Sequence, residues 1–263
     1  MPTDIRNYTC SSFSIDYATF GDGPRALVIL PGMSVTSVLM AAGAVARAFS
    51  QFCSTHTVYL IDRKRDIQPG YTVIDMADDT ATMLQALGIS DADIYGASQG
   101  GMIALALAIR HPELVHKLAV ASTLSRQNSR SLETMAEWVG LSEQDDPAAL
   151  NRSVFKKVYS PEFFSRNERA FRVIEKSGSQ EEMRRFGILS VATADFDVYD
   201  RLQEIKCPVT VFGVEDDTVL SGQGSREIAE KLGCPYFCYP GKGHAAYDED
   251  PEFTSRLLAF FNA

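Results

Sequence analysis

A serine, an aspartate and a histidine are spaced along the chain so that they could act together as nucleophile, acid and base. Ser98 lies at the centre of Gly96-Ala97-Ser98-Gln99-Gly100, between a short apolar run and an apolar helical segment. In such a strand–turn–helix context, small residues near the serine permit a tight turn that projects its hydroxyl from the edge of a sheet. We predict that Ser98 is a nucleophile.

A base is needed because a serine hydroxyl is a weak nucleophile until its proton is removed. The base is usually a histidine that a buried carboxylate orients. Of the four histidines, His244 alone lies on a loop of small residues, 241–246, between a short strand and the final helix. We predict that the other three are surface or helix-capping residues: His56, His111 and His116. We therefore predict that His244 is the base.

The carboxylate is expected on a loop that follows a core strand, between the serine and the histidine in chain order. The acidic residues in this interval that we consider are Glu215, Asp216 and Asp217, and more remotely Asp195 and Asp197. Asp216 lies three residues after Gly213, which ends the strand at 209–213, and is therefore expected at the sheet edge. We predict Asp216 as the acid, with Asp217 as the alternative.

An oxyanion hole needs two backbone N–H groups that point at the developing negative charge. The residue after the nucleophile, Gln99, supplies one in the predicted turn. The second is expected from the loop after an early strand, where Pro31-Gly32 precedes Met33. We predict the N–H groups of Met33 and Gln99, although Pro31-Gly32 alone also fits an ordinary turn.

The elements that must position these groups alternate between strand and helix. This alternation predicts an α/β fold with a mostly parallel central sheet flanked by helices. The predicted strands are 25–30, 57–62, 93–95, 117–122, 209–213 and 236–239. The predicted helices outside the middle of the chain are 40–52, 73–87, 100–110, 227–232 and 251–261.

The middle of the chain has a different pattern. Residues 125–200 are polar and helical in pattern, and they lack a convincing buried strand. We predict a core formed by 1–124 and 201–263, with 125–200 as a helical lid. The lid aromatics Trp138, Phe155, Phe163 and Phe164 are candidates for a substrate pocket, or they pack the lid against the core.

Charge, apolar runs and cysteine spacing argue against nucleic-acid binding, membrane insertion and a metal site. The formal net charge of the 263 residues is −9, which disfavours nucleic acid and anionic membranes as partners. The N-terminus does not resemble a signal peptide, and no apolar run is long enough to span a membrane. The five scattered cysteines suggest neither a disulfide framework nor a zinc site. We expect a cytoplasmic protein without metal or organic cofactor, and its oligomeric state is open.

These residues, in the order Ser98, Asp216, His244, resemble the α/β-hydrolase superfamily, and the sequence from Gly96 to Met102 followed by His111-Pro112 looks like members with a helical lid. The resemblance covers both core portions and implies the hydrolase fold. Two motifs depart from many relatives. Pro31-Gly32 replaces His-Gly, and residues 62–66, Asp-Arg-Lys-Arg-Asp, replace Asp-x-Arg-Gly-x-Gly. Serine at the elbow also disfavours the epoxide-hydrolase and dehalogenase branches.

The expected activity is hydrolysis of a small ester or related acyl substrate through a Ser98 acyl-enzyme. The same residues would also serve a C–C bond hydrolase or a proline-type peptidase. In the peptidase, an acidic lid residue would hold the substrate amino terminus, and the candidates are Glu133, Glu137, Glu143 and Asp145. A non-enzymatic ligand receptor of the same fold is the alternative from a different class.

Overall fold

A single eight-stranded sheet runs through the described part of the chain, residues 3–263, in the computed structural model. Its strands are β1 (Asp4–Thr9), β2 (Ser14–Phe20), β3 (Arg25–Leu30), β4 (His56–Ile61), β5 (Ala92–Ala97), β6 (Val115–Ala121), β7 (Val209–Val214) and β8 (Tyr236–Tyr239). Their order across the sheet is β1-β2-β4-β3-β5-β6-β7-β8. From β4 to β8 all neighbours are parallel, whereas β1 and β2 add an antiparallel edge. The predicted fold class is confirmed.

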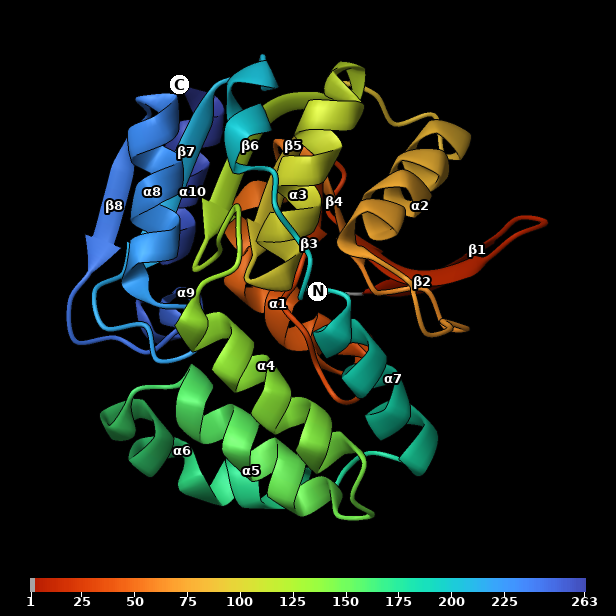
Figure 1. Cartoon of the computed structure of the whole chain (residues 1–263). Helices are drawn as coiled ribbons and strands as arrows, with labels where there is room; N and C mark the ends of the chain where they lie inside the picture. Colours follow the sequence, from red (N-terminus) through yellow and green to blue (C-terminus); the bar gives the residue numbers. More distant parts are fainter. Residues whose placement is uncertain (1–2) are drawn as a thin grey trace.

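Helices cover both faces of this sheet (Figure 1). They are α1 (Ala42–Ala48), α2 (Val73–Ala86), α3 (Gln99–Arg110), α8 (Gly222–Leu232), α9 (Ala246–Glu249) and α10 (Phe253–Asn262). Side chains of β3 alternate between two apolar clusters: Val28 and Leu30 face one, and Leu27 and Ile29 face the other. The first cluster includes side chains of α2, α3 and α8, and the second those of α1 and α10. Strands buried on both faces explain the continuous apolar runs in the sequence.

Four further helices lie between β6 and β7, below the sheet in the view of Figure 1. They are α4 (Ser129–Ser142), α5 (Pro147–Val158), α6 (Pro161–Ile174) and α7 (Gln180–Val191), and we call them the helical insertion. Each begins after a side chain that accepts a backbone N–H of its first turn, as helix caps do. These caps are Asn128, Asp146, Ser160 and Ser179. The proposed limits of the lid, 125–200, stay a prediction.

The sequence predicted that no apolar segment is long enough to span a membrane. Within residues 3–263, none of the helices combines the length and the apolar character required to cross a bilayer.

Candidate active site

Ser98 occupies a strained turn between β5 and α3. Its backbone angles are φ 53° and ψ −124°, a region that non-glycine residues rarely adopt and that costs about 1–3 kcal/mol. The Ser98 carbonyl oxygen accepts three hydrogen bonds, from the N–H groups of Gly101 and Met102 and from the hydroxyl of Thr123, which hold the turn in place. The side chain itself stays partly exposed. The structure therefore gives Ser98 the conformation expected of a nucleophile elbow.

Close backbone packing explains the glycine on the helix side of this turn. A β-carbon at Gly100 would lie 1.9 Å from the carbonyl oxygen of Leu30 and 2.5 Å from that of Pro31. The first turn of α3 thus packs directly on the loop after β3. At Gly96 a β-carbon would meet the Gly100 carbonyl oxygen at 2.4 Å. Both positions of the pentapeptide are sterically fixed, as the sequence predicted.

His244 is buried and hydrogen-bonded to an aspartate, but the partner is Asp217. The Nδ1 atom of His244 lies 2.8 Å from Oδ2 of Asp217, and the two side chains are only 2% and 3% exposed. Asp216 lies on the solvent-exposed side of the same loop. The prediction of Asp216 as the partner of His244 is therefore wrong by one residue, and the alternative, Asp217, takes this position.

The loop after β7 turns the Asp217 carboxylate inward. Its Oδ1 atom accepts the backbone N–H groups of Val219 at 2.8 Å and Leu220 at 3.0 Å, while Oδ2 faces His244. Burial alone would raise the pKa of Asp217, but the charge of His244 and these hydrogen bonds hold that pKa below its ordinary value. An ionised carboxylate can only accept, so the Nδ1–H of His244 is the donor.

The other three histidines lie elsewhere. His111 is partly exposed and contacts Asp78 at 2.8 Å, and His116 is partly exposed and contacts Asp93 at 2.8 Å. His56 was predicted at the surface, and this is wrong because its side chain is fully buried and its Nε2 atom lies 3.0 Å from Oδ2 of Asp93. All three lie at or near the ends of strands or helices away from the Ser98 elbow.

The loop after β3 lies against Ser98. A β-carbon at Gly32 would be 3.2 Å from Cβ and 3.7 Å from Oγ of Ser98. Among the hydrogen bonds of residues 3–263, none uses the backbone N–H of Met33 or of Gln99 as donor. The two N–H groups predicted for the oxyanion hole are therefore free of other acceptors among these residues, and their role stays a prediction.

The side chains of Arg63 and Gln99, to which the sequence analysis gave no role, join this region together. The guanidinium of Arg63 donates to Oε1 of Gln99 at 3.2 Å and to the carbonyl oxygen of Pro31. The Gln99 amide in turn donates to the carbonyl oxygen of Leu189 in α7 at 2.8 Å. Burial lowers the pKa of Arg63 to about 10. Arg63 therefore joins the loop after β3, the elbow and the insertion, and the unusual Asp-Arg-Lys-Arg-Asp sequence was the available signal.

Each of the four aromatic residues proposed for a substrate pocket packs against another aromatic ring of the insertion. Trp138 packs against Phe186 with ring centres 5.9 Å apart and donates to Ser153 at 3.2 Å. Three rings pack around Phe171 of α6: Phe155 at 4.8 Å, Tyr159 of the α5–α6 turn at 5.0 Å and Phe164 at 5.3 Å. Phe163 stacks on Tyr159 at 5.0 Å. Trp138 and Phe186 also belong to the apolar cluster that includes β3, so they pack the insertion against the sheet core. A substrate-binding role for Trp138, Phe155, Phe163 and Phe164 stays a prediction.

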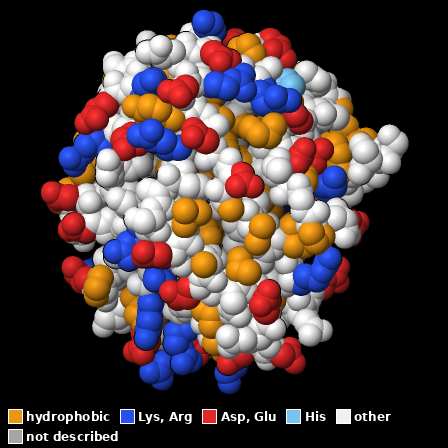
Figure 2. Space-filling view, viewed as in Figure 1, with side chains coloured by type: hydrophobic (Ala, Val, Ile, Leu, Met, Phe, Trp, Pro, Cys, Tyr) orange, Lys and Arg blue, Asp and Glu red, His pale blue; other side chains and the backbone are white. Residues whose placement is uncertain are grey.

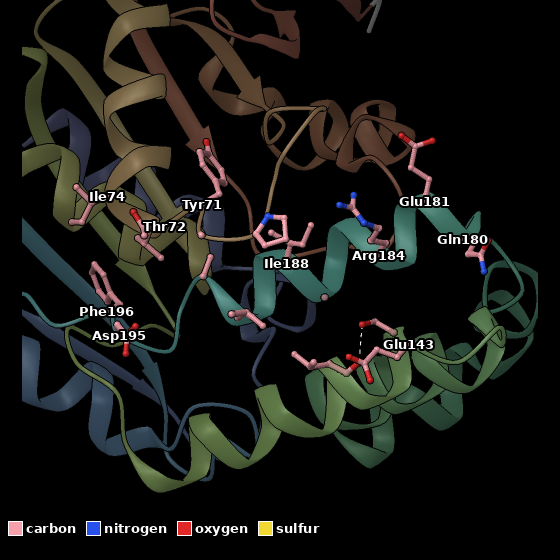
Figure 3. Close-up of a pocket in the computed structure, with 18 residues that line it drawn as sticks. Tyr71, Thr72, Ile74, Glu143, Gln180, Glu181, Arg184, Ile188, Asp195 and Phe196 are labelled. Carbon is pink, nitrogen blue, oxygen red and sulfur yellow. Dashed lines mark hydrogen bonds between the residues drawn. The ribbon is translucent and has the colours of Figure 1, made fainter.

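A hollow of about 990 Å³ opens on the outer side of α7, where Figure 2 shows hydrophobic side chains gathered on the surface. It is lined by residues of α4 and α7 and by the segment that leads into α2, including Tyr71, Glu143, Arg184 and Ile188 (Figure 3). Its lining contains neither Ser98 nor the Asp217–His244 pair. Size alone therefore does not mark this hollow as the place of the chemistry.

A mostly parallel sheet with helices on both faces and a serine on a strained strand–helix elbow defines an α/β hydrolase. The chain belongs to the alpha/beta hydrolase fold family, whose profile matches residues 3–251, and it is a hydrolytic enzyme.

Curated relatives are similar over about three quarters of the chain. A protein of Rhizobium rhizogenes strain K84 named "Putative carbamate hydrolase RutD" is 29% identical over 192 residues, which cover 72% of this chain and 73% of that protein. A protein of the same name from Caulobacter sp. strain K31 is 28% identical over 204 residues, which cover 75% of each chain.

Solved structures share the fold over nearly the full length. MGS-M2, an alpha/beta hydrolase enzyme from a Medee basin deep-sea metagenome library, superimposes with a TM-score of 0.86 at 23% identity and covers 98% of both chains. An enol-lactonase from Burkholderia xenovorans LB400 gives a TM-score of 0.83 at 19% identity, covering 98% of this chain and all of that one. At these identities the similarity shows the fold.

Proposed function

We propose that this chain hydrolyses small ester or related acyl substrates through a covalent intermediate on Ser98, with His244 as base and Asp217 as the carboxylate that orients it. The observation that carries the proposal is the 2.8 Å contact between His244 Nδ1 and Asp217. Because the Nδ1–H donates to Asp217, the lone pair of the neutral imidazole lies on Nε2, where it can accept a proton.

The reaction then follows from these groups. His244 Nε2 takes the proton of the Ser98 hydroxyl while Oγ attacks the substrate carbonyl carbon, and the resulting imidazolium passes its proton to the leaving group. Collapse of the tetrahedral intermediate breaks the bond to the leaving group and leaves an acyl-Ser98. A water molecule, deprotonated by His244, attacks this ester, and the proton returns to Ser98. Asp217 stays ionised throughout because its pKa is held low.

The N–H groups of Met33 and Gln99 are proposed to bind the negative oxygen of both tetrahedral intermediates. Their support is the contact of the Gly32 loop with Ser98 and the absence of other acceptors for these two groups among residues 3–263. In such sites one donor contributes about 10²- to 10³-fold to turnover. Arg63 holds the elbow and the loop after β3 in a fixed relative position, because it donates to both Gln99 and Pro31.

A small molecule is the proposed substrate, and the helical insertion is the proposed lid. The names of the relatives favour an acyl group on oxygen: carbamate hydrolase in the curated relatives, and enol-lactonase and esterase among the similar structures. A carbamate ester would give a carbamoyl-Ser98 by the same steps, with the alcohol as leaving group. Carbamates therefore belong in the substrate panel beside esters and lactones.

The test compares the wild type with Ser98→Ala and with Ser54→Ala, an exposed serine on a turn, as a matched control. We expect a fluorophosphonate probe to label the wild type and Ser54→Ala but not Ser98→Ala. Hydrolysis of p-nitrophenyl acetate, butyrate and a p-nitrophenyl carbamate should fall by at least about 10³-fold in Ser98→Ala only. Undiminished labelling of Ser98→Ala would refute the nucleophile.

The same panel separates the other functions that this constellation could serve. Turnover of a β-diketone but not of esters would identify a C–C bond hydrolase, and cleavage of a prolyl amide would identify a peptidase. Tight binding of ligands without turnover or labelling would identify a receptor.

A further inference from the structure

The turn between α5 and α6 packs against the loop that carries His244. A β-carbon at Gly243 would lie 2.3 Å from the backbone nitrogen of Ser160 and 2.5 Å from the carbonyl carbon of Tyr159. On the other side of His244, the N–H of Ala245 donates to the carbonyl oxygen of Val158 at 2.9 Å. Both neighbours of His244 in the chain therefore rest on this one turn of the insertion.

Glu249, at the end of α9, bridges the two segments with its carboxylate. Its Oε1 atom accepts the N–H of Ser160 at 2.7 Å and the N–H of Gly243 at 3.2 Å. Its Oε2 atom accepts the hydroxyl of Ser160 at 2.7 Å. Charge-assisted hydrogen bonds of this kind are about twice as strong as neutral ones. The side chain of Ser160 is almost fully buried, so water does not readily replace its partner.

The same region of the insertion also contacts the loop that carries Asp217. The hydroxyl of Thr218, the residue after Asp217, donates to the carbonyl oxygen of Lys157 at 2.7 Å. Residues 157–160 thus accept hydrogen bonds from Thr218, next to Asp217, and from Ala245, and they pack against Gly243 on the other side of His244. The insertion cannot lift away at this turn without releasing the two loops that hold the Asp217–His244 pair.

We propose that Glu249 is a positioning residue that locks the His244 loop to the seated insertion through Ser160, so that base geometry depends on the insertion being closed at the α5–α6 turn. This inference rests on the proposed role of His244 as the base. Glu249 does not touch the reacting atoms. It acts on the backbone at Gly243, one residue before the base, and therefore on the direction of the imidazole.

The test uses the full chain and measures kcat and KM on p-nitrophenyl butyrate for several variants. Glu249→Ala removes both acceptor oxygens and their three hydrogen bonds. We expect kcat to fall about 10- to 100-fold with KM changed less than about 2-fold, because a small displacement of a catalytic group has that cost. Glu249→Gln keeps the Oε1 position that both N–H groups use, so we expect it to retain kcat within about 5-fold.

Ser160→Ala supplies the second arm. It removes the hydroxyl donor and leaves the N–H donor, so we expect a smaller loss than in Glu249→Ala. If the two residues act as one clamp, the double variant should lose no more kcat than Glu249→Ala alone, as double-mutant cycles show for coupled groups. Glu252→Ala is the matched control, because Glu252 is an exposed carboxylate three residues away that pairs with Arg256. It should match the wild type.

Three results would overturn the inference. Unchanged kcat in Glu249→Ala would show that the clamp does not position the base. A loss of kcat that only follows a lower Tm, and disappears when the assay is cooled to where every variant is folded, would show a merely structural role. Additive losses in the double variant would show independent effects.

The inference and the proposed function fail in different ways. If the wild type is not labelled at Ser98 by the fluorophosphonate, the proposed function fails before any variant is compared. If the wild type is labelled and active, and Glu249→Ala labels at the same rate, only the inference fails.

Discussion

The Oδ2 atom of Asp217 lies 2.8 Å from Nδ1 of His244, while Asp216, one residue earlier, lies at the surface. Local hydrogen bonding decides between the two carboxylates. The N–H groups of Val219 and Leu220 close a turn over Oδ1 of Asp217 and leave Oδ2 to face the imidazole. The depressed pKa of Asp217 keeps this acceptor ionised down to acidic pH.

Exchange of each carboxylate for its amide tests this arrangement. In Asp217→Asn the amide can present a donor to Nδ1 and favour the wrong tautomer of His244, so we expect kcat to fall about 10³- to 10⁴-fold on an activated ester. Asp216→Asn should stay within about 2-fold of the wild type, because surface substitutions have small effects. Steady-state kinetics at pH 7 check both, and a larger loss in Asp216→Asn would contradict the assignment.

Local sequence predicts much of the fold and two residues of the candidate site, Ser98 and His244. The parallel strands are buried on both faces, so 25–30 and 209–213 stand out as apolar runs, and glycines mark the elbow at Ser98 because close backbone packing leaves no room for a side chain. β1 and β2 escaped prediction. β1 is largely exposed and is held by pairing with β2, a contact that leaves little apolar signal.

The missed parts of the site depend on contacts between distant segments. Whether Asp216 or Asp217 faces His244 is decided by a turn that periodicity does not show. The links from Arg63 to Gln99 and from Glu249 to Ser160 join residues 36 and 89 positions apart, which no local pattern reveals. His56 was misjudged for the same reason, since its burial depends on Asp93, from another strand.

Asp93 is the buried centre of a polar cluster at the start of β5, at the opposite end of this strand from Ser98. It contacts His56, His116 and Arg25, which lie on three neighbouring strands. Arg25 and His116 are 36% and 41% exposed, and only His56 is buried with Asp93. Loss of the carboxylate leaves the buried His56 without its ionised partner, so we expect Asp93→Asn to lower the free energy of unfolding by about 1–3 kcal/mol at pH 7. Turnover per folded molecule should stay within about 2-fold, as measured below the unfolding transition.

The pH dependence of this loss has a definite sign. Burial would raise the pKa of Asp93, but its bonds to His56, His116 and Arg25 bring that pKa below the ordinary value. A lowered pKa in the folded state contributes stability that is present above the unfolded pKa of about 3.9 and is lost as pH falls through the folded pKa. Urea unfolding at pH 7 and pH 3 should show that the difference in the free energy of unfolding between the wild type and Asp93→Asn is smaller at pH 3. Asp4→Asn, a surface control, should show almost no gap at either pH.

A pair of substitutions distinguishes the outer hollow from the proposed site. Val191 is 55% exposed and lines the hollow beside α7, so Val191→Phe fills part of it without touching Ser98. We expect kcat/KM to stay within about 2-fold. Gly32→Ala places a methyl group 3.2 Å from Cβ of Ser98 and should lower kcat/KM about 10- to 100-fold by displacing Ser98 or its loop. If Val191→Phe caused the larger loss, the hollow would be where substrate binds.

Two glycine-to-alanine changes on helices should have opposite effects on stability. At Gly100 the new methyl group would lie 1.9 Å from the Leu30 carbonyl oxygen, so α3 and the loop after β3 must separate, and we expect both a lower Tm and a loss of turnover. At Gly140, on an exposed part of α4, a β-carbon meets nothing within 4 Å. Alanine there restricts the unfolded chain and should raise the free energy of unfolding by about 0.5–1 kcal/mol with kcat unchanged.

Urea unfolding and ester hydrolysis on the same preparations check this pair. A stable, fully active Gly100→Ala variant would mean that the elbow and the loop after β3 are less tightly packed than the structure shows. In that event the packing of α3 on Leu30 and Pro31 would not hold the loop after β3 against the elbow, and the proposed oxyanion hole would lose part of its support.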